Sequence, residues 1–265
     1  MPRVVHLQVL SSGSKGNATL VRAGDLQLLV DAGLGVRALS ERFAAAHVGP
    51  RNLDHLLVTH GHRDHSRSAG AVAKRQHAVL HAAEAILTHR GLARAPDKHA
   101  LRIGRAHTLL PERGEGEVTY TPVLLPHDCD PTVAFKLEHE GRCAVILTDI
   151  GQPCPEVARH LKGAQLLVLE FNYDAQMLRE GPYPETLKRR ISGGRGHLSN
   201  VQAAKLLGQL AGPDLHTLVL AHLSAHNNTP GLALAAAQEA LAGLGLERVR
   251  VIVASQDQVG ENLAV

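Results

Sequence analysis

The sequence predicts an α+β fold in which two mixed β-sheets are covered by helices. Strand-like runs follow one another closely at residues 105–110, 117–125, 132–139 and 142–147, which favours an antiparallel stretch. Elsewhere apolar strand-like runs alternate with helical segments, as in crossover connections between parallel strands. The 265 residues are enough to bury one full core, so we expect a single domain over residues 1–265.

The first part of the chain begins with strands and continues as alternating strands and helices. Gly24-Asp25 between two apolar runs indicates a hairpin, and residues 91–104 are basic and irregular. The expected strands cover residues 4–10, 18–22, 26–30, 54–58 and 78–81, and the expected helices cover residues 36–46, 66–76 and 82–89.

The second part repeats the alternation of strand and helix. Glu140-Gly141 is expected to turn the last hairpin, and Ser199 with Gln202 predicts a capping box. The expected helices cover residues 155–161, 184–191, 201–210 and 231–242, and the remaining strands cover residues 165–169, 217–221 and 248–253.

A histidine-rich segment, residues 59–65, carries three imidazoles and one carboxylate directly after an apolar run. The chain has 18 histidines, yet chance would place His-x-His-x-Asp-His in such a chain with an expectation under roughly 0.01. Imidazole and carboxylate without thiolate suit divalent Zn, Fe or Mn in a site that is not a structural zinc knuckle. His60 and His62 can bind one ion, and Asp64 and His65 a second, so the segment predicts a two-metal centre.

Two ions need more ligands than this segment supplies, and three other residues follow apolar strand-like runs in the same way. They are His127, Asp149 and His222. The ends of strands are rigid and present catalytic groups well. We therefore expect these residues to complete the centre, whereas His77, His81 and His89 have no partner at ligand spacing and are expected at the surface.

These segments, taken in order, resemble the motifs of metallo-β-lactamase-fold hydrolases over nearly the whole chain. The resemblance implies a four-layer αβ/βα sandwich, with the two mixed sheets packed face to face and the helices outside. It implies that Asp149 bridges two divalent ions, Mn or Zn, and that Asp31 supports the histidine-rich turn. The other implied ligands are His60, His62 and His127 for one ion and Asp64, His65 and His222 for the other.

Later motifs narrow the resemblance. Residues 196–204 and 218–224 are similar to tRNase Z-type phosphodiesterases, and together with residues 11–18, 169–174 and 227–230 they resemble the bacterial YycJ/WalJ group more closely. Members of that group are associated with 5′-to-3′ exonuclease activity on double-stranded DNA and with mismatch repair, commonly with manganese. The resemblance therefore implies that a double-stranded DNA end is the partner.

The expected reaction is attack on phosphorus by a hydroxide that bridges both ions. Asp64 would orient this hydroxide or take its proton. Glu170, hydrogen-bonded to His197, would keep that imidazole protonated so that it can protonate the leaving oxygen. The candidate substrate-binding residues are Arg195, Asn200 and Asn227, and the run 188–190 could also follow the DNA backbone.

Composition limits the other classes of function. The net charge of +3 and the pI of about 8.9 permit an anionic substrate. With three Tyr, three Phe and no Trp, base stacking is not expected to dominate nucleic-acid binding. No run approaches the ~20 apolar residues of a membrane span, and residues 1–7 predict a first strand rather than a signal peptide. A cytoplasmic protein without membrane contact is expected.

The three cysteines, Cys129, Cys143 and Cys154, lack CxxC spacing and are expected to be free thiols.

Two other functions remain open at this point. One is a hydrolase of small phosphodiesters, lactones or thioesters that uses the same ligands. The other is a metal-binding regulatory protein without turnover, which the complete ligand set and the Glu170–His197 pair disfavour.

Overall fold

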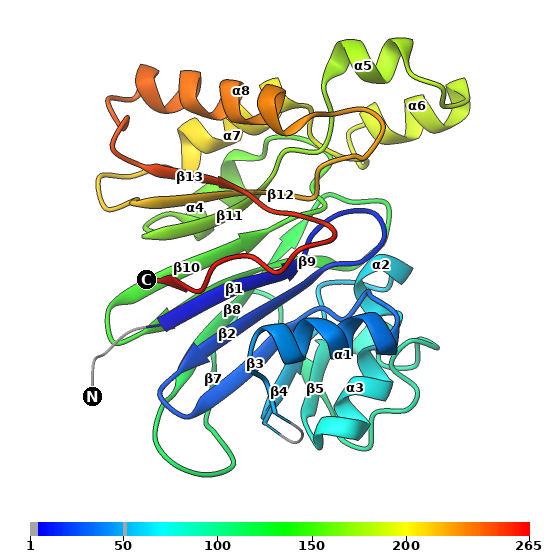
Figure 1. Ribbon diagram of the computed structural model, residues 1–265, viewed down its shortest axis with the longest axis vertical. Coiled ribbons are helices and arrows are strands. Elements are labelled where there is room, and N and C mark those ends of the chain that lie inside the picture. The colour runs from blue at the N-terminus through cyan, green and yellow to red at the C-terminus, as the bar shows by residue number, and fades with distance from the viewer. Residues whose placement is uncertain (1–4, 50–51) are drawn as a thin grey trace. The chain divides into compact units, whose positions relative to one another are not determined.

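The computed structural model describes residues 5–49 and 52–265, which form two seven-stranded sheets and helices. Residue 4, in the first expected strand, lies outside the described residues. The predicted combination of two mixed sheets with helices is confirmed (Figure 1). Among the described residues, no helix is both long and apolar enough to cross a membrane.

The first sheet has the strand order β14-β1-β2-β3-β4-β5-β6. Its pairs are antiparallel from β14 to β3 and parallel from β3 to β6. Its strands are β1 (Val5–Ser11), β2 (Ala18–Ala23), β3 (Leu26–Val30), β4 (His55–Leu57), β5 (Val79–Ala83), β6 (Lys98–Leu101) and β14 (Leu263–Ala264). The intervening helices are α1 (Val36–Ala45), α2 (Arg63–Ser66), α3 (Ala69–Gln76) and the 3-10 turn η1 (Glu84–Ile86).

The second sheet has the strand order β13-β12-β11-β10-β9-β8-β7. Its strands are β7 (His107–Leu109), β8 (Val118–Leu125), β9 (Thr132–His139), β10 (Arg142–Leu147), β11 (Leu166–Glu170), β12 (Thr217–Ala221) and β13 (Arg250–Val253). The helices of this part are α4 (Pro155–Leu161), α5 (Ala175–Glu180), α6 (Glu185–Ser192), α7 (Asn200–Leu210) and α8 (Pro230–Gly243). From β10 to β13 the strands run parallel, which is why helices connect them.

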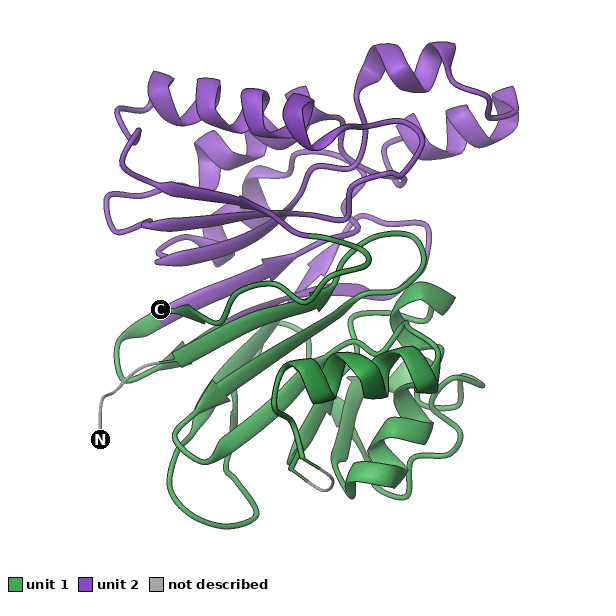
Figure 2. Ribbon diagram, viewed as in Figure 1, with its two compact units in different colours: residues 1–122, 137–142, 255–265 green, residues 123–136, 143–254 purple. Residues whose placement is uncertain are grey.

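The chain divides into two compact units (Figure 2). Unit 1 comprises residues 1–122, 137–142 and 255–265, and unit 2 comprises residues 123–136 and 143–254. In unit 2, the helices α4, α7 and α8 bury apolar side chains in one core with strands β10 to β12. In unit 1, α3 packs on β4 and β5. The expectation of a single domain over residues 1–265 stays a prediction.

Several expected elements differ from the observed ones. The helix expected at residues 82–89 is the end of β5 followed by η1, and part of the irregular stretch 91–104 forms the edge strand β6. Three of the four β6 side chains are exposed, so an apolar pattern could not reveal this strand. The capping box of Ser199 and Gln202 is confirmed at the start of α7.

His81 is buried in unit 1 with 6% exposure, so its expected surface position is wrong. Its Nε2 lies 3.1 Å from Nδ1 of His55, and its ring centroid lies 5.5 Å from that of His99 and 6.0 Å from that of Tyr120. Burial, and then repulsion from His55, His99 and His107, lowers the pKa of His81 to about 3. The imidazole of His81 is therefore neutral in the folded protein at mildly acidic pH.

The buried His81 is expected to make the protein less stable in acid. In the unfolded chain its pKa returns to 6.5. Between pH 6.5 and about 3 only the unfolded state binds this proton, so the free energy of unfolding falls by up to about 1.4 kcal/mol per pH unit. The free energy of unfolding, measured with urea at pH 7, 6 and 5, should therefore fall less steeply with decreasing pH for His81→Gln than for the wild type. A His160→Gln control, at an exposed position, should show the same change of unfolding free energy with pH as the wild type. Equal pH dependence in all three proteins would contradict the attribution of the acid destabilisation to His81.

Candidate metal centre

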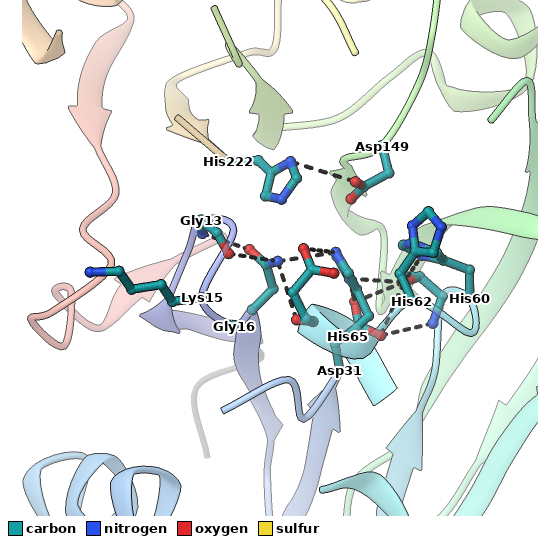
Figure 3. Close-up of polar contacts among 12 residues, drawn as sticks. Gly13, Lys15, Gly16, Asp31, His60, His62, His65, Asp149 and His222 are labelled. Carbon is teal, nitrogen blue, oxygen red and sulfur yellow. Dashed lines mark hydrogen bonds and ion pairs between the residues drawn. The ribbon is translucent and has the colours of Figure 1, made fainter. Parts of the chain in front are cut away.

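The histidine-rich turn lies in unit 1 directly after β4 and ends in the short helix α2. His60 and His65 are fully buried, and His62 and Asp64 are partly exposed. The ring centroid of His60 lies 4.8 Å from that of His62 and 4.2 Å from that of His65 (Figure 3). The carboxylate Oδ2 of Asp64 is 3.6 Å from Nε2 of His65. The four predicted ligands of this turn are therefore close together.

The carboxylate of Asp31 holds this turn in place. Asp31 follows β3 in a left-handed conformation with φ 63°, which places its side chain beside the turn. Its Oδ1 accepts a hydrogen bond from the Thr59 backbone N–H at 2.8 Å, and its Oδ2 is 2.7 Å from Nδ1 of His65. The proton of His65 thus lies on Nδ1, and Nε2 carries the lone pair, which is the form of imidazole that binds metals. The expected contact between Asp31 and the turn is confirmed.

The loop after β1 packs against the same turn. The Asn17 backbone N–H donates to the Asp64 carbonyl at 2.8 Å, and the Asn17 side-chain nitrogen lies 3.0 Å from Nε2 of His65. Gly33 approaches so closely that an added Cβ would lie 1.6 Å from the Asp64 carbonyl oxygen. Position 33 therefore excludes every side chain, and the loop around Gly13 and Gly16 supports the turn from one side (Figure 3).

In unit 2, two candidate ligands follow the parallel strands β10 and β12, which lie on either side of β11. Asp149 comes shortly after β10 and His222 directly after β12. Both have left-handed backbone conformations, with φ 62° and 57°, at a cost of roughly 1–3 kcal/mol each that is typical of functional sites. Nδ1 of His222 lies 3.5 Å from Oδ1 of Asp149, as Figure 3 shows. Strand ends thus bring these two residues together as predicted.

Glu170, the last residue of β11, is fully buried between these groups. Its Oε2 lies 3.3 Å from Nδ1 of both His197 and His222 and accepts from the Asp149 backbone N–H at 2.6 Å. Its Oε1 accepts from the Leu198 backbone N–H at 2.7 Å. The expected contact between Glu170 and His197 is therefore confirmed, and Glu170 also organises the residues around it.

The Glu170–His197 pair favours the ionised form of both partners. Burial opposes ionisation of Glu170, but the charge of His197 and hydrogen bonds from His197 and His222 outweigh it and lower the pKa of Glu170 to about 2. For His197, burial lowers the pKa, while the Glu170 carboxylate, and Asp149 after it, raise it more strongly, so that the pKa is raised overall. The pair can therefore hold a proton on the imidazole.

His127 follows β8 and presents one ring nitrogen for coordination. Its Nδ1 lies 3.0 Å from the Gly196 carbonyl, so this atom carries the proton and donates it. Its Nε2 lies 3.3 Å from Oδ1 of Asp128 and 3.9 Å from Oδ1 of Asp149. Burial lowers the pKa of His127 despite the nearby Asp149. A neutral imidazole oriented through its other nitrogen is the form that binds metals.

The donor atoms of unit 2 fit a divalent metal ion. Asp149, Glu170, His197 and His222 each offer an atom, and these atoms lie within 4.8 Å of one another. Nitrogen and carboxylate oxygen donors suit Zn, Mn or Fe. The turn of unit 1 offers the same chemistry, with three imidazoles and a carboxylate. The residues present in each unit therefore fit the ions that the sequence implies.

The three candidate substrate-binding residues lie in unit 2 in different surroundings. Arg195 is exposed, and its Nε donates to the His127 carbonyl at 2.8 Å. Asn200 is 4% exposed and exchanges hydrogen bonds with Asn228 at 3.0 and 2.9 Å, while Asn227 is fully buried. Substrate contact by Arg195, Asn200 and Asn227 stays a prediction.

Two asparagines that support ligands were not predicted. Asn17 contacts His65, and the Asn172 side chain donates to the His222 carbonyl at 2.7 Å. Both lie within segments that carried the family resemblance, which was the available signal. Neither has the charge or the position after an apolar run that marked the other site residues.

The comparison with protein families decides which family this is. The model of the β-lactamase superfamily domain matches residues 27–223. The chain belongs to the metallo-β-lactamase superfamily. The buried imidazoles and carboxylates described above lie in or directly beside the segments expected from this superfamily's motifs.

Two relatives in the metallo-β-lactamase superfamily are named as nucleases. Exodeoxyribonuclease YycJ of Bacillus anthracis is 31% identical over 233 residues, covering 86% of either protein. Ribonuclease Z of Mycobacterium marinum is 29% identical over 252 residues, covering 83% of this chain and 86% of that protein. The resemblance to both groups, inferred from the motifs, is confirmed.

Solved metallo-β-lactamase structures share the fold. YhfI of Bacillus subtilis has a TM-score of 0.73 at 18% identity and covers 99% of this chain and 100% of its own. Zn²⁺-bound PqqB of Methylobacterium extorquens has a TM-score of 0.70 at 17% identity, with 98% and 100% covered. The predicted metallo-β-lactamase fold is confirmed, and the chain is a metal-dependent hydrolase of this superfamily.

Proposed function

We propose that this hydrolase is a phosphodiesterase that removes nucleotides from the 5′ end of double-stranded DNA in the cytoplasm, in DNA mismatch repair. The observation that carries the choice of substrate is the 31% identity to an exodeoxyribonuclease over 86% of the chain. The buried Glu170–His197 pair supports the reaction type, since it supplies the proton that a departing alkoxide needs.

The proposal assigns the ligands as the superfamily's pattern implies. His60, His62 and His127 would hold one ion, Asp64, His65 and His222 the other, and Asp149 would contact both. Two divalent ions, Mn or Zn, would supply Lewis-acid stabilisation of the phosphodiester and a water of lowered pKa. What supports the assignment is the orientation of His65 and His127, whose Nδ1 atoms face the Asp31 carboxylate and the Gly196 carbonyl, so that the lone pair of each ring lies on Nε2.

The proposed roles of the residues differ. Asp64 would orient the attacking water or accept its proton, because its carboxylate is partly exposed beside His65. His197, held by Glu170, would donate a proton to the leaving oxygen. Arg195 would contact the DNA backbone, since its guanidinium is exposed at the start of the same loop. For the buried Asn200 and Asn227, contact with substrate stays a prediction.

The proposal is tested with purified protein, Mn or Zn, 5′-labelled duplex DNA and bis-p-nitrophenyl phosphate. We expect release of labelled mononucleotides from the duplex and loss of that release on chelation of the metal. Hydrolysis of the chromogenic diester without action on any nucleic acid would overturn the nuclease assignment in favour of a small-molecule hydrolase. No turnover with either metal on either substrate would overturn the proposal altogether and favour a regulatory metal-binding protein.

A further inference from the structure

Unit 1 contains a basic cavity of about 630 Å³ beside the histidine-rich turn. It lies among the start of α1, the helix α2 and the loop after η1. Four arginines and one histidine contribute to its lining, and the described lining includes no carboxylate. These residues, called the arginine cavity below, are Arg63, Arg67, His89, Arg90 and Arg94.

The four guanidinium groups of the arginine cavity have no counter-charge of their own. Within residues 5–49 and 52–265, none of them forms an ion pair with a carboxylate. Like charges gathered in one cavity repel one another and create a field that attracts anions. The charge of the arginine cavity is therefore available to a ligand.

The basic residues of unit 2 that were expected to follow the DNA backbone, in contrast, lie close to carboxylates. Lys188 lies 3.2 Å from Glu185, Arg190 lies 2.5 Å from Asp128, and Arg195 lies 3.5 Å from Asp130. Carboxylates of unit 2 thus partly compensate these charges. The charges of the arginine cavity, which the sequence did not single out as a group, are not compensated by carboxylates in this way. The cavity therefore attracts anions more strongly than the paired basic residues of unit 2 do.

The backbone of the arginine cavity is fixed to the histidine-rich turn. An added Cβ at Gly91 would lie 2.4 Å from the Ser66 carbonyl oxygen, and the Gly70 N–H donates to the Gly91 carbonyl at 2.8 Å. The Ser66 hydroxyl lies 3.0 Å from the carbonyl oxygens of both Gly61 and His62. The loop that carries two of the arginines is therefore held against the segment that carries the predicted ligands.

His89 adds an N–H donor to the same cavity. The Gly91 backbone N–H donates to Nδ1 of His89 at 3.3 Å. Because Nδ1 accepts this bond, the N–H of the ring lies on Nε2, which can donate to an acceptor. Near the α1 side, a Cβ built at Gly35 would lie 3.8 Å from Arg67 Cζ, which shows that this guanidinium extends over the start of the helix.

We propose that the arginine cavity binds phosphate groups of the nucleic acid strand that the enzyme cleaves. Planar guanidinium groups bind phosphate oxygens in pairs, with charge-assisted hydrogen bonds. The volume exceeds that of one phosphate, so the cavity accommodates a stretch of backbone. Gly61 and Arg63 flank His62 in the chain, so the bound strand continues directly to the histidine-rich turn. This inference rests on the proposed nuclease function.

The test uses the double variant Arg90→Gln/Arg94→Gln, which leaves the neighbours of the predicted ligands intact. Duplex affinity is measured by fluorescence anisotropy at several NaCl concentrations with the metal chelated. The slope of log Kd against log salt is expected to fall by about 2, because each lost phosphate contact removes about 0.9. The matched control, Arg105→Gln/Arg142→Gln, removes the same charge from exposed positions outside the cavity and is expected to keep the wild-type slope.

A second measurement, of kcat/KM on two substrates, separates DNA binding from the chemical step. With metal present, kcat/KM of the double variant should fall more for duplex DNA than for bis-p-nitrophenyl phosphate, which is too small to span two sites. A larger loss for 5′-phosphorylated than for 5′-hydroxyl ends would identify a terminal phosphate as the bound group, and equal losses would identify the backbone diester. A wild-type enzyme that cleaves duplex DNA, with an unchanged slope in the double variant, would overturn this inference and leave the proposed function standing. A wild type that neither binds nor cleaves nucleic acid would overturn both.

Discussion

Replacing His197 by alanine is expected to slow the cleavage of duplex DNA by about 10²–10⁴-fold, the usual contribution of a general acid. His197 is held by the fully buried Glu170, whose Oε2 lies 3.3 Å from its Nδ1. Without the imidazole, the departing sugar oxygen leaves as an unprotonated alkoxide. Single-turnover rates with a saturating amount of metal would measure the loss.

The leaving group distinguishes a proton donor from a merely structural residue. Nitrophenolate is a stable anion that needs little protonation, so His197→Ala should lose much less activity on bis-p-nitrophenyl phosphate than on DNA. Bound metal, measured by mass spectrometry, should equal that of the wild type and of a His160→Ala control at an exposed position. Equal losses on both substrates would contradict the role of proton donor, and loss of metal would make His197 a ligand instead.

Changing Asp149 to asparagine is expected to lower metal content and reduce hydrolysis of both substrates by more than about 10²-fold. Loss of a residue that only orients a ligand costs about 10–100-fold, and Asp149 is proposed to be a ligand itself. Asparagine is the sharpest choice because Asp149 has φ 62°, a left-handed conformation that asparagine tolerates better than alanine does. The fold should therefore survive while the charge is removed.

Asp174→Asn is the matched control for this change. Asp174 caps α5 by accepting from the backbone N–H groups of Gln176 and Met177, and asparagine caps helices equally well. Metal content and activity should therefore match the wild type in the control. Full metal content in Asp149→Asn would contradict the assignment of Asp149 as a ligand.

The part of the site that follows simple strand patterns could be predicted from the sequence. His127, Asp149 and His222 each follow an apolar run. For Asp149 and His222 the runs are the parallel strands β10 and β12, whose C-terminal ends lie at one edge of the sheet. Glu170 at the end of β11 fits the same pattern. Its contacts with His197 and with the Asp149 backbone needed the family resemblance or the structure.

The features that could not be predicted from the sequence depend on contacts between residues far apart in the chain, which local sequence patterns do not reveal. His81 was expected at the surface because it has no partner at ligand spacing in the sequence, yet the side chains of His55, His99 and Tyr120 pack around its ring. The arginine cavity draws on residues 63–67 and 89–94, which are separated by more than 20 positions and are brought together by close contacts at Gly70 and Gly91. The second stretch is basic in the sequence, but no local pattern pairs it with the first.

The pairing of β14 with β1 joins His6 to Ala264 and Leu7 to Leu263. During synthesis on the ribosome, β1 is made long before its outer neighbour, which emerges only after all of unit 2 has been made. Until then β1 presents an unpaired edge that can join other strands, and closing it requires a contact between residues far apart in the chain, which slows folding. The outer edge of β1 is therefore open to pairing with other chains until residues 263–264 have been made.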